Sequence, residues 1–280
     1  MILLEAVNTY AARLRSAGIE SSRLDSEVIV SHVLGFERYR LITESSRILS
    51  GDEMAEIEKY IERREKREPL AYLLNEKEFY SLPFYVDQNV LIPRPETELL
   101  VDMVIYEAAL DSRVLDLCTG SGAIAVACKK FRSDLDISAS DISRSALNIA
   151  EKNCKQILKN DSVAFILSDI FENISGKFDI IVTNPPYVSE LVRNDLEPEL
   201  NYEPDHALFS GESGNEIISS IISQSPEFLN PGGLLLMELG RDNREFVKSE
   251  SMKYFDCSIF KDYSGLDRIA MLKLKDTDKI

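Results

Sequence analysis

Residues 114–125 read Val-Leu-Asp-Leu-Cys-Thr-Gly-Ser-Gly-Ala-Ile-Ala, and this stretch decides the fold. Its first part is apolar and its last part begins a helix, so it predicts a strand that ends in a tight turn. Gly120 and Gly122 lack a Cβ, which lets the backbone of the turn approach a ligand closely. Asp141 ends the next expected strand, about twenty residues past the turn, where an acid can bind both hydroxyls of a ribose. The stretch therefore predicts a site for an adenosine cofactor.

Asp116 helps to choose between two kinds of adenosine cofactor. A carboxylate at the end of the strand, beneath the turn, would repel the pyrophosphate of a dinucleotide. S-adenosylmethionine carries no phosphate, and its ammonium and sulfonium groups tolerate a nearby acid. Asp169 ends the third strand and could accept a hydrogen bond from the amino group of adenine. Acids at the ends of three successive strands, beside a glycine turn, favour S-adenosylmethionine.

Short apolar strands alternate with helices from residue 93 onward. Such alternation predicts an α/β fold whose parallel sheet is covered on both faces. Too few residues separate the last two strands for a helix, so the final strand is expected to run antiparallel. Helices are expected after residues 94–98 and near residues 121, 143, 214 and 242. The expected strands span residues 113–117, 135–139, 163–167, 177–183, 233–239, 255–260 and 268–274.

The first 74 residues predict a small helical domain. Apolar residues recur at helical spacing over residues 3–14, and Gly18 follows as a stop signal. Ser22 is expected to cap a second helix that ends at Gly35. Residues 50–53 read Ser-Gly-Asp-Glu, which fits a capping box that opens a third helix. We expect three parts: a helical domain over 1–74, a β-hairpin linker over 75–92 and an α/β domain over 93–280.

Composition and charge exclude several classes of protein. Of the 280 residues, 44% are hydrophobic and 29% charged, which excludes a wholly disordered chain. The 48 acidic and 32 basic residues give a net charge of −16, so we expect no stable binding to nucleic acid. The four cysteines form no CxxC pair and the two histidines lie far apart, so no metal site is expected. With neither a signal peptide nor an apolar stretch long enough to span a membrane, we expect a cytoplasmic protein.

Residues 178–183 predict a buried strand that runs directly into Asn184-Pro185-Pro186-Tyr187. The two prolines stiffen this loop and remove two N–H donors, so its carbonyl groups remain as acceptors. Asn184 adds an amide oxygen, and Tyr187 adds a flat aromatic face. Such a loop can accept both N–H bonds of a planar –NH2 group and stack on it. A rigid turn at the end of a strand is the structural alternative, but the position after the glycine turn and its acids favours a substrate site.

Taken together, these motifs resemble those of a known family. The loop at residues 184–187 resembles the signature of class I methyltransferases that act on planar amine or amide nitrogens. Further stretches are similar to the protein-(glutamine-N5) methyltransferases of peptide chain release factors, called PrmC or HemK. They are Glu-Pro-Leu-Ala-Tyr-Leu (68–73), Glu-Phe-Tyr (78–80), Leu-Ile-Pro-Arg-Pro-Glu-Thr-Glu (91–98), Tyr-Glu-Pro (202–204), Ala-Leu (207–208), Leu-Asn-Pro-Gly-Gly (229–233) and Asp-Tyr-Ser-Gly-Leu-Asp-Arg (262–268).

The resemblance implies a class I S-adenosylmethionine-dependent methyltransferase, with a Rossmann-like, mostly parallel seven-stranded sheet and an antiparallel last strand. The helical N-terminal domain would bind the substrate. The implied reaction carries a methyl group from S-adenosyl-L-methionine to the side-chain amide nitrogen of the glutamine in the Gly-Gly-Gln motif of peptide chain release factors. It leaves S-adenosyl-L-homocysteine and supports translation termination. The expected catalytic residues are Asn184, Pro185, Pro186 and Tyr187. With the residues argued above, the expected cofactor-binding residues are Asp116, Cys118, Thr119, Gly120, Ser121, Gly122, Asp141, Asp169, Ile170 and Asn184.

Two residues depart from the family pattern. Cys118 stands where many class I methyltransferases have glycine, at a point where the backbone approaches the cofactor. Ile170 stands where some relatives have an aromatic residue beside adenine, which keeps apolar packing and loses stacking. All four cysteines are expected to be packing residues, and His206 is expected to take no part in catalysis.

Two alternative functions stay open from the sequence. DNA adenine-N6 methyltransferases also carry Asn-Pro-Pro-Tyr, but they must extrude a base and hold the duplex, which a net charge of −16 does not favour. A non-catalytic S-adenosylmethionine-binding protein would be expected to have a degenerate substrate loop, whereas the loop at residues 184–187 is intact.

Overall fold

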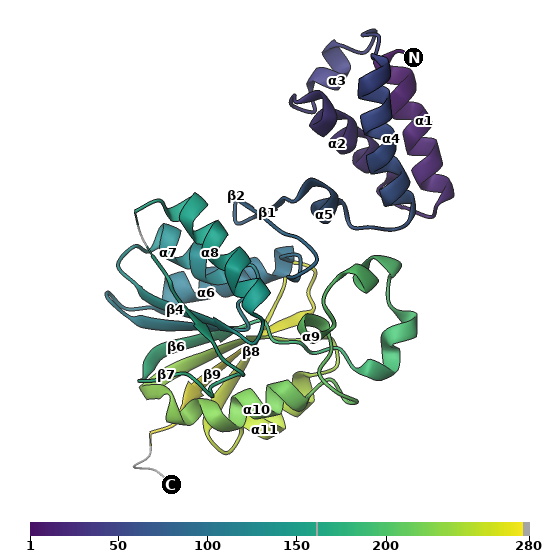
Figure 1. Cartoon of the computed structure of the whole chain (residues 1–280). Coiled ribbons are helices and arrows are strands. Elements are labelled where there is room, and N and C mark those ends of the chain that lie inside the picture. Colours follow the sequence, from purple (N-terminus) through teal and green to yellow (C-terminus); the bar gives the residue numbers. More distant parts are fainter. Residues whose placement is uncertain (161, 277–280) are drawn as a thin grey trace. The chain divides into compact units, whose positions relative to one another are not determined.

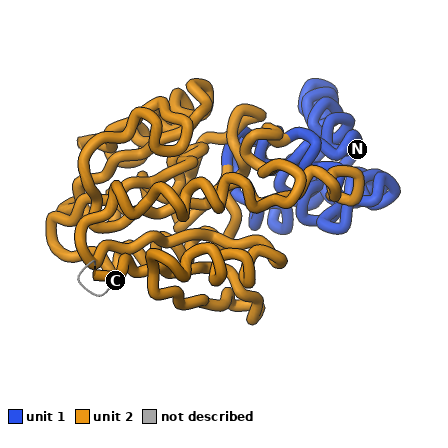
Figure 2. The backbone as a smooth tube through the Cα atoms, turned by 90° about the horizontal axis from the view of Figure 1, so that it is seen from below, with its two compact units in different colours: residues 1–76, 197–202 blue, residues 77–196, 203–280 orange. Residues whose placement is uncertain are grey.

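The computed structural model describes residues 1–160 and 162–276, which form two compact units (Figure 2). One unit contains Met1–Glu76 together with Glu197–Tyr202, and we call it the helical unit. The other contains Lys77–Leu196 and the described residues from Glu203 onward, and we call it the sheet unit. The return of residues 197–202 to the helical unit was not expected from the sequence.

The helical unit is built from helices whose ends largely follow the sequence signals (Figure 1). The Ser50 hydroxyl accepts a hydrogen bond from Glu53 N at 3.2 Å, and Ser50 N donates to the Glu53 carboxylate at 2.8 Å, which confirms the capping box. The prediction of Ser22 as a cap is wrong, because it is the first helical residue and its side chain is buried. The elements are α1 (Leu3–Ser16), α2 (Ser22–Leu34), α3 (Arg40–Thr43), α4 (Gly51–Glu65), α5 (Leu70–Leu74) and the 3-10 turn η3 (Pro198–Tyr202).

An ion-pair network around the buried Arg64 holds residues 197–202 in the helical unit. The Arg64 side chain is 7% exposed, and its Nε donates to Asp25 Oδ2 at 2.8 Å. Arg64 Nη1 and Arg67 Nη2 both donate to the Glu199 carboxylate, at 3.0 and 2.6 Å. Because buried charges are costly unless paired, these contacts tie Glu199 to α4 and to the residues that follow it.

The sheet unit begins with a hairpin and continues as a twisted, mostly parallel sheet (Figure 1). The hairpin strands are β1 (Lys77–Phe79) and β2 (Leu82–Phe84). Among the described residues, the main sheet has seven strands in the order β5-β4-β3-β6-β7-β9-β8. The last strand, β9, lies antiparallel to both of its neighbours, as predicted. The strands are β3 (Arg113–Leu117), β4 (Asp136–Asp141), β5 (Ala164–Leu167), β6 (Phe178–Thr183), β7 (Leu229–Glu238), β8 (Phe255–Lys261) and β9 (Asp267–Leu274).

Helices cover both faces of this sheet, as the alternating sequence predicts. Val114 of β3 packs under the helices of one face, whereas Leu115 and Leu117 pack under those of the other, because side chains alternate along a strand. Helices α6 (Glu98–Glu107), α7 (Ala123–Phe131) and α8 (Arg144–Leu158) lie on one face, and α10 (Glu216–Gln224) and α11 (Arg244–Ser251) on the other (Figure 1). Shorter elements are η1 (Pro95–Thr97), η2 (Glu190–Asp195), α9 (Asp205–Leu208) and η4 (Ser225–Glu227).

The strand order reverses at β3, and this reversal indicates where a ligand can bind. The chain leaves β3 toward β4 on one side, and β6 pairs with β3 on the other side. Ligands of open α/β sheets bind at the carboxyl ends of the strands where the order reverses in this way. The ends of β3, β4, β5 and β6 are therefore where a site is expected.

Candidate active site

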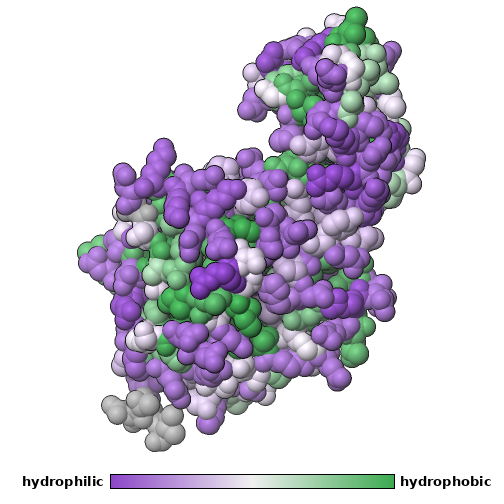
Figure 3. Space-filling model, in the orientation of Figure 1, coloured by the Kyte–Doolittle hydropathy of each residue, from purple (hydrophilic) through white to green (hydrophobic). Residues whose placement is uncertain are grey.

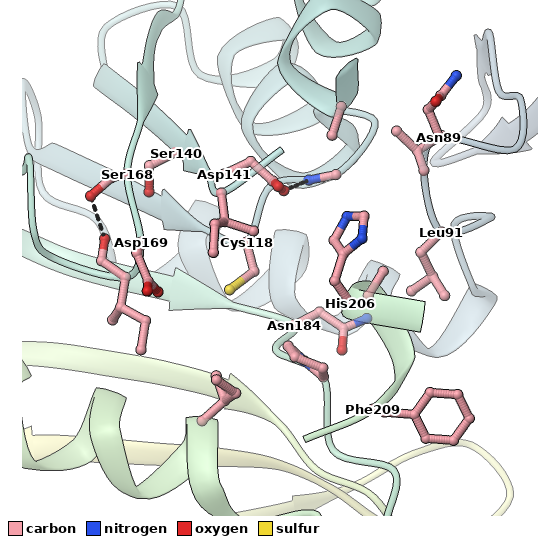
Figure 4. Close-up of a pocket in the computed structure, with 18 residues that line it drawn as sticks. Asn89, Leu91, Cys118, Ser140, Asp141, Ser168, Asp169, Asn184, His206 and Phe209 are labelled. Carbon is pink, nitrogen blue, oxygen red and sulfur yellow. Dashed lines mark hydrogen bonds between the residues drawn. The ribbon is translucent and has the colours of Figure 1, made fainter. Parts of the chain in front are cut away.

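A cavity of about 220 Å³ lies at the carboxyl ends of these four strands (Figure 4). Each strand contributes the residues that follow or end it. The wall of the cavity contains Cys118 and Gly120 after β3, Ser140 and Asp141 of β4, Ser168, Asp169 and Ile170 after β5, and Asn184 and Pro186 after β6.

The glycine turn is fixed to the end of β4. Gly120 N donates to Asp141 Oδ2 at 2.9 Å (Figure 4), and Ser143 N donates to Asp141 Oδ1 at 2.8 Å. Each carboxylate oxygen keeps a further lone pair, so Asp141 can still accept the two hydroxyls of a ribose. Burial raises the pKa of Asp141, which these backbone bonds and the nearby His206 partly offset.

Gly122 has a packing role rather than a lining role. Its φ is +80°, and a Cβ there would lie 3.0 Å from Ala150 Cβ and 3.2 Å from Ala150 Cα. The missing side chain therefore lets the start of α7 approach α8.

Asp116 is wholly buried beneath the turn. Its Oδ2 accepts hydrogen bonds from Thr119 Oγ1 at 2.6 Å and from Ala125 N at 3.1 Å. Its Oδ1 has no hydrogen-bond partner among the described residues. Burial raises the pKa of Asp116 to about 7 against the lowering effect of those two bonds. A cationic group bound near the turn would favour the ionised form of this carboxyl, whose unpaired oxygen would then be its counter-charge.

Two residues of the cavity wall adopt the left-handed backbone conformation without being glycine. Cys118 has φ +59° and Ile170 has φ +46°, a region that a β-branched residue rarely occupies. The Ser168 hydroxyl donates to Ile170 O at 2.9 Å and accepts from Asn173 N at 2.9 Å, which holds this turn in place. Burial raises the pKa of the Cys118 thiol, so it stays protonated and does not act as a nucleophile.

The cofactor-binding residues expected from the sequence thus divide into two groups. Six lie on the cavity wall: Cys118, Gly120, Asp141, Asp169, Ile170 and Asn184. The other four are not among the described residues that line the cavity: Asp116, Thr119, Ser121 and Gly122. Ser121, for example, is buried, and its carbonyl oxygen accepts from Asn153 Nδ2 at 2.9 Å.

The Asn-Pro-Pro-Tyr loop meets the same cavity with only part of its length. Asn184 and Pro186 line the cavity, whereas Pro185 and Tyr187 are not among the described lining residues. Asn184 Nδ2 donates to Thr97 Oγ1 at 3.2 Å. The Tyr187 ring packs against Gly240, where a Cβ would lie 2.9 Å from Cδ2 of the ring. Burial and the nearby Glu238 raise the pKa of the Tyr187 hydroxyl, so it stays protonated.

Two of the motifs that are distant in sequence are joined beside this loop. Arg94 forms an ion pair with Glu203, whose side chain is 1% exposed. Ile92 N donates to the other oxygen of Glu203 at 3.0 Å. Glu203, from the Tyr-Glu-Pro segment at residues 202–204, therefore holds the segment at residues 91–98 through both of its carboxylate oxygens.

The cavity also contains residues that the sequence did not single out. His206 of α9 lies between Asp141 and Asn184 (Figure 4), although it was expected to take no part in catalysis. Its neighbours follow the Tyr-Glu-Pro motif, and that proximity was the one signal in the sequence. The other unexpected lining residues are Asn89, Val90, Leu91, Ile142, Ala146, Ala207, Phe209 and Ile217.

Comparisons with known proteins identify the family. The model of the PrmC N-terminal domain matches residues 5–74, and that of the methyltransferase small domain matches residues 95–211. A release factor glutamine methyltransferase of Leptospira interrogans is 39% identical over 92% of this chain and 93% of that protein. A protein of the same name from Rhodopirellula baltica is 36% identical over 98% and 95%. The chain belongs to the release factor glutamine methyltransferase family.

Solved structures support the fold of the sheet unit. A methyltransferase of Pyrococcus furiosus superposes with a TM-score of 0.56 and 18% identity, over 76% of this chain and 98% of that one. A 16S rRNA methyltransferase of Thermus thermophilus, solved with its cofactor and guanosine, gives a TM-score of 0.53 at 15% identity, over 71% and 50%. At these identities the likeness concerns the class I methyltransferase fold alone.

The methyltransferase domain implies the use of S-adenosylmethionine, and the cavity fits this molecule. Acids stand at the ends of β3, β4 and β5, and the buried Asp116 has an oxygen without a partner among the described residues.

Within residues 1–160 and 162–276 there is no cluster of three or more His, Cys, Asp or Glu side chains suited to a metal ion. In that same part of the chain, every helix is too short or too polar to cross a lipid bilayer.

Proposed function

We propose that this chain methylates the side-chain amide nitrogen of the glutamine in the Gly-Gly-Gln motif of peptide chain release factors, with S-adenosyl-L-methionine as the methyl donor. Such a modification supports translation termination. One observation carries the proposal: Asn184 lies on the wall of the same cavity as Gly120 and Asp141. An acceptor suited to a planar –NH2 group thus faces the place where an adenosine cofactor would bind.

Several residues would hold the cofactor. Asp141 would accept the ribose hydroxyls, while Asp169 and Ile170 would border adenine. The positively charged methionine amino group would favour the ionised form of Asp116, whose unpaired carboxylate oxygen would then be its counter-charge. When bound, S-adenosylmethionine supplies an electrophilic methyl group on a positively charged sulfur.

The substrate loop would act mainly by orientation. The lone pair of an amide nitrogen is delocalised into its carbonyl group, so the amide is a poor nucleophile. The motif holds no strong base, and proximity and orientation must therefore supply most of the rate. We expect Asn184 Oδ1 and the Pro185 carbonyl to accept the two N–H bonds of the target glutamine. Pro186 would keep the loop stiff, and the stacking of Tyr187 on the target amide stays a prediction.

The helical unit would bind another part of the release factor. Apolar side chains gather on its surface at the end where α3 lies (Figure 3). Tyr39, Ile42 and Ile48 are 67%, 80% and 76% exposed. Exposed apolar patches of this kind mark surfaces for protein partners. A net charge of −16 supports a protein substrate over a stable complex with nucleic acid, and a role in translation would put the enzyme in the cytoplasm.

Mass spectrometry can test this function. A full-length release factor is incubated with the protein and labelled S-adenosylmethionine, and the modified residue is located by peptide fragmentation. We expect one methyl group on the glutamine of the Gly-Gly-Gln motif. Methylation of another residue would contradict the proposal. So would the absence of methylation by protein that binds the cofactor.

Asn184→Ala is the matched test of the site. Loss of one such positioning bond is expected to cost about 2–4 kcal/mol in the transition state, by analogy with removed oxyanion-hole donors. Turnover should therefore fall far more than the affinity for S-adenosylhomocysteine. Asn230→Ala is the control, because Asn230 Nδ2 also donates a hydrogen bond, to Asp179 Oδ1 at 2.7 Å, but at the opposite end of the sheet.

A further inference from the structure

A chain of buried hydrogen bonds runs from the substrate loop to the end of β7. Asn184 Nδ2 donates to Thr97 Oγ1 at 3.2 Å, and Thr97 Oγ1 donates to Glu238 Oε2 at 2.7 Å. The other oxygen, Glu238 Oε1, accepts from the Tyr187 hydroxyl at 3.3 Å. Thr97 and Glu238 are 4% and 1% exposed. Both ends of the Asn-Pro-Pro-Tyr loop are thus connected to one carboxyl group.

Counting protons fixes the direction of these bonds. An ionised carboxylate can only accept, so Glu238 takes the single hydroxyl proton of Thr97. Thr97 then has only lone pairs to offer to its second neighbour. It can accept from the –NH2 group of Asn184 but cannot donate to the amide oxygen.

This direction matters for the substrate because an asparagine amide can rotate by half a turn. With the –NH2 group on Thr97, the oxygen Oδ1 is left for the cavity that Asn184 lines. In the reverse orientation the –NH2 group would enter the cavity and meet the –NH2 group of the target glutamine, donor against donor. A hydrogen bond would be lost and two donors would oppose each other.

We propose that Thr97 and the ionised Glu238 are positioning residues that keep Asn184 Oδ1 turned toward the target amide. The inference rests on the proposed function, since it takes a glutamine –NH2 group as the target. Neither residue is expected to contact the cofactor or the substrate, because neither is among the described residues that line the cavity.

The charge on Glu238 makes this arrangement sensitive to pH. The charged and titratable groups around it are Arg268 of β9, Glu96 of η1 and the Tyr187 hydroxyl. Burial raises the pKa of Glu238 to about 6, while the Thr97 bond, Arg268 and the Tyr187 bond favour the ionised form. Below that pH the added proton can be donated to Thr97 Oγ1. Thr97 can then donate to Asn184, and the reverse amide orientation becomes favourable.

Kinetics at saturating cofactor and saturating release factor test the positioning role. For the wild type, kcat should fall about tenfold between pH 7 and pH 5, following the ionised fraction of Glu238. Glu238→Gln should remove this acid limb. At pH 7.5, Thr97→Val should lower kcat about tenfold or more with little change in KM for the release factor. Thr97→Ser should restore kcat because it keeps the hydroxyl.

A matched control uses the same chemistry away from the cavity. The Ser219 hydroxyl donates to Glu250 Oε1 at 2.8 Å, between α10 and α11. Ser219→Ala and Glu250→Gln remove a comparable hydroxyl–carboxylate bond, and both should keep the wild-type kcat and its pH profile.

A second readout does not depend on methyl transfer. The side-chain amide signals of Asn184, assigned in 15N-labelled protein by their loss in Asn184→Ala, should shift with pH around a midpoint near 6. This shift should be absent in Glu238→Gln. If the signals titrate in this way but no release factor is methylated, the proposed function is wrong and the positioning chain stands.

The opposite pattern would overturn the positioning role of Thr97 and Glu238 and leave the proposed function intact. It would consist of a methylated release factor, Asn184 signals that do not respond to pH, and a Thr97→Val variant with wild-type kcat. An acid limb that persists in Glu238→Gln would likewise contradict it, because a group other than Glu238 would then be responsible.

Discussion

Replacing Asp116 by Asn should flatten the dependence of folding stability on pH. The folded protein raises the pKa of this carboxyl from 3.8 to about 7, because its burial outweighs two hydrogen bonds. Between these two values the folded state holds a proton that the unfolded chain has released. The contribution is therefore fully present below pH 3.8 and is lost as pH rises through 7.

The size of the effect follows from the shift. About three pKa units correspond to about 4 kcal/mol of stability, of which about 2.5 kcal/mol disappears between pH 5 and pH 8. The Asn oxygen can still accept from Thr119 and Ala125. Its –NH2 group would take the place of the unpaired Oδ1, at a cost that does not change with pH. Subtracting the stability change at pH 5 from that at pH 8 removes this constant cost.

Urea unfolding of the wild type and Asp116→Asn at both pH values measures this difference. The stability gained by the variant should be about 2–3 kcal/mol larger at pH 8 than at pH 5. Asp256→Asn is the control for the loss of one negative charge, because Asp256 is exposed on β8. Parallel pH curves for the wild type and Asp116→Asn would refute the claim that burial holds the proton on this carboxyl.

Three further predictions concern the cavity and the helical unit. Asp141→Ala removes the proposed ribose acceptor and the partner of Gly120 N, so calorimetry should show S-adenosylhomocysteine bound at least tenfold more weakly; unchanged affinity would exclude the ribose role. Gly240→Ala places a Cβ 2.6 Å from Asn243 Oδ1 and 2.9 Å from the Tyr187 ring, and kcat should fall while cofactor affinity is retained; a fully active variant would mean that both neighbours can move at no cost to catalysis. Ser50→Ala breaks the capping box of α4 and should destabilise the protein by about 1 kcal/mol in chemical unfolding, whereas an unchanged midpoint would mean that water replaces the cap.

Local patterns in the sequence were sufficient to predict the strands of the sheet unit and where several of them end. The strand expected at residues 113–117 is β3, and the acid expected at the end of the next strand is Asp141 of β4. Periodicity and strand ends depend on neighbouring residues, so they can be read without knowing the fold. The Gly120 and Asp141 pair lies on the cavity wall for the same reason, since a βαβ unit fixes where its strands end.

Contacts between distant segments could not be derived in this way. Thr97 of η1 and Glu238 of β7 are far apart in sequence, and the packing of the adjacent helix α6 on β7 brings their oxygen atoms to 2.7 Å. For His206 the sequence offered one signal, its position just after the Tyr-Glu-Pro motif, and this signal does not distinguish a cavity residue from a loop residue. The packing of the Tyr187 ring against Gly240 depends on where β7 ends, and the stacking of this ring on the target amide stays a prediction.

The return of residues 197–202 to the helical unit has a consequence during synthesis. A ribosome that has made only the first 76 residues has produced all the helices from α1 to α5, but not Glu199. Until then Arg64 has one carboxylate partner, Asp25, and Arg67 lacks its partner Glu199. The helical unit can therefore reach its final ion pairing only after more than a hundred residues of the sheet unit have left the exit tunnel, so the two units mature together although the helices come first in the chain.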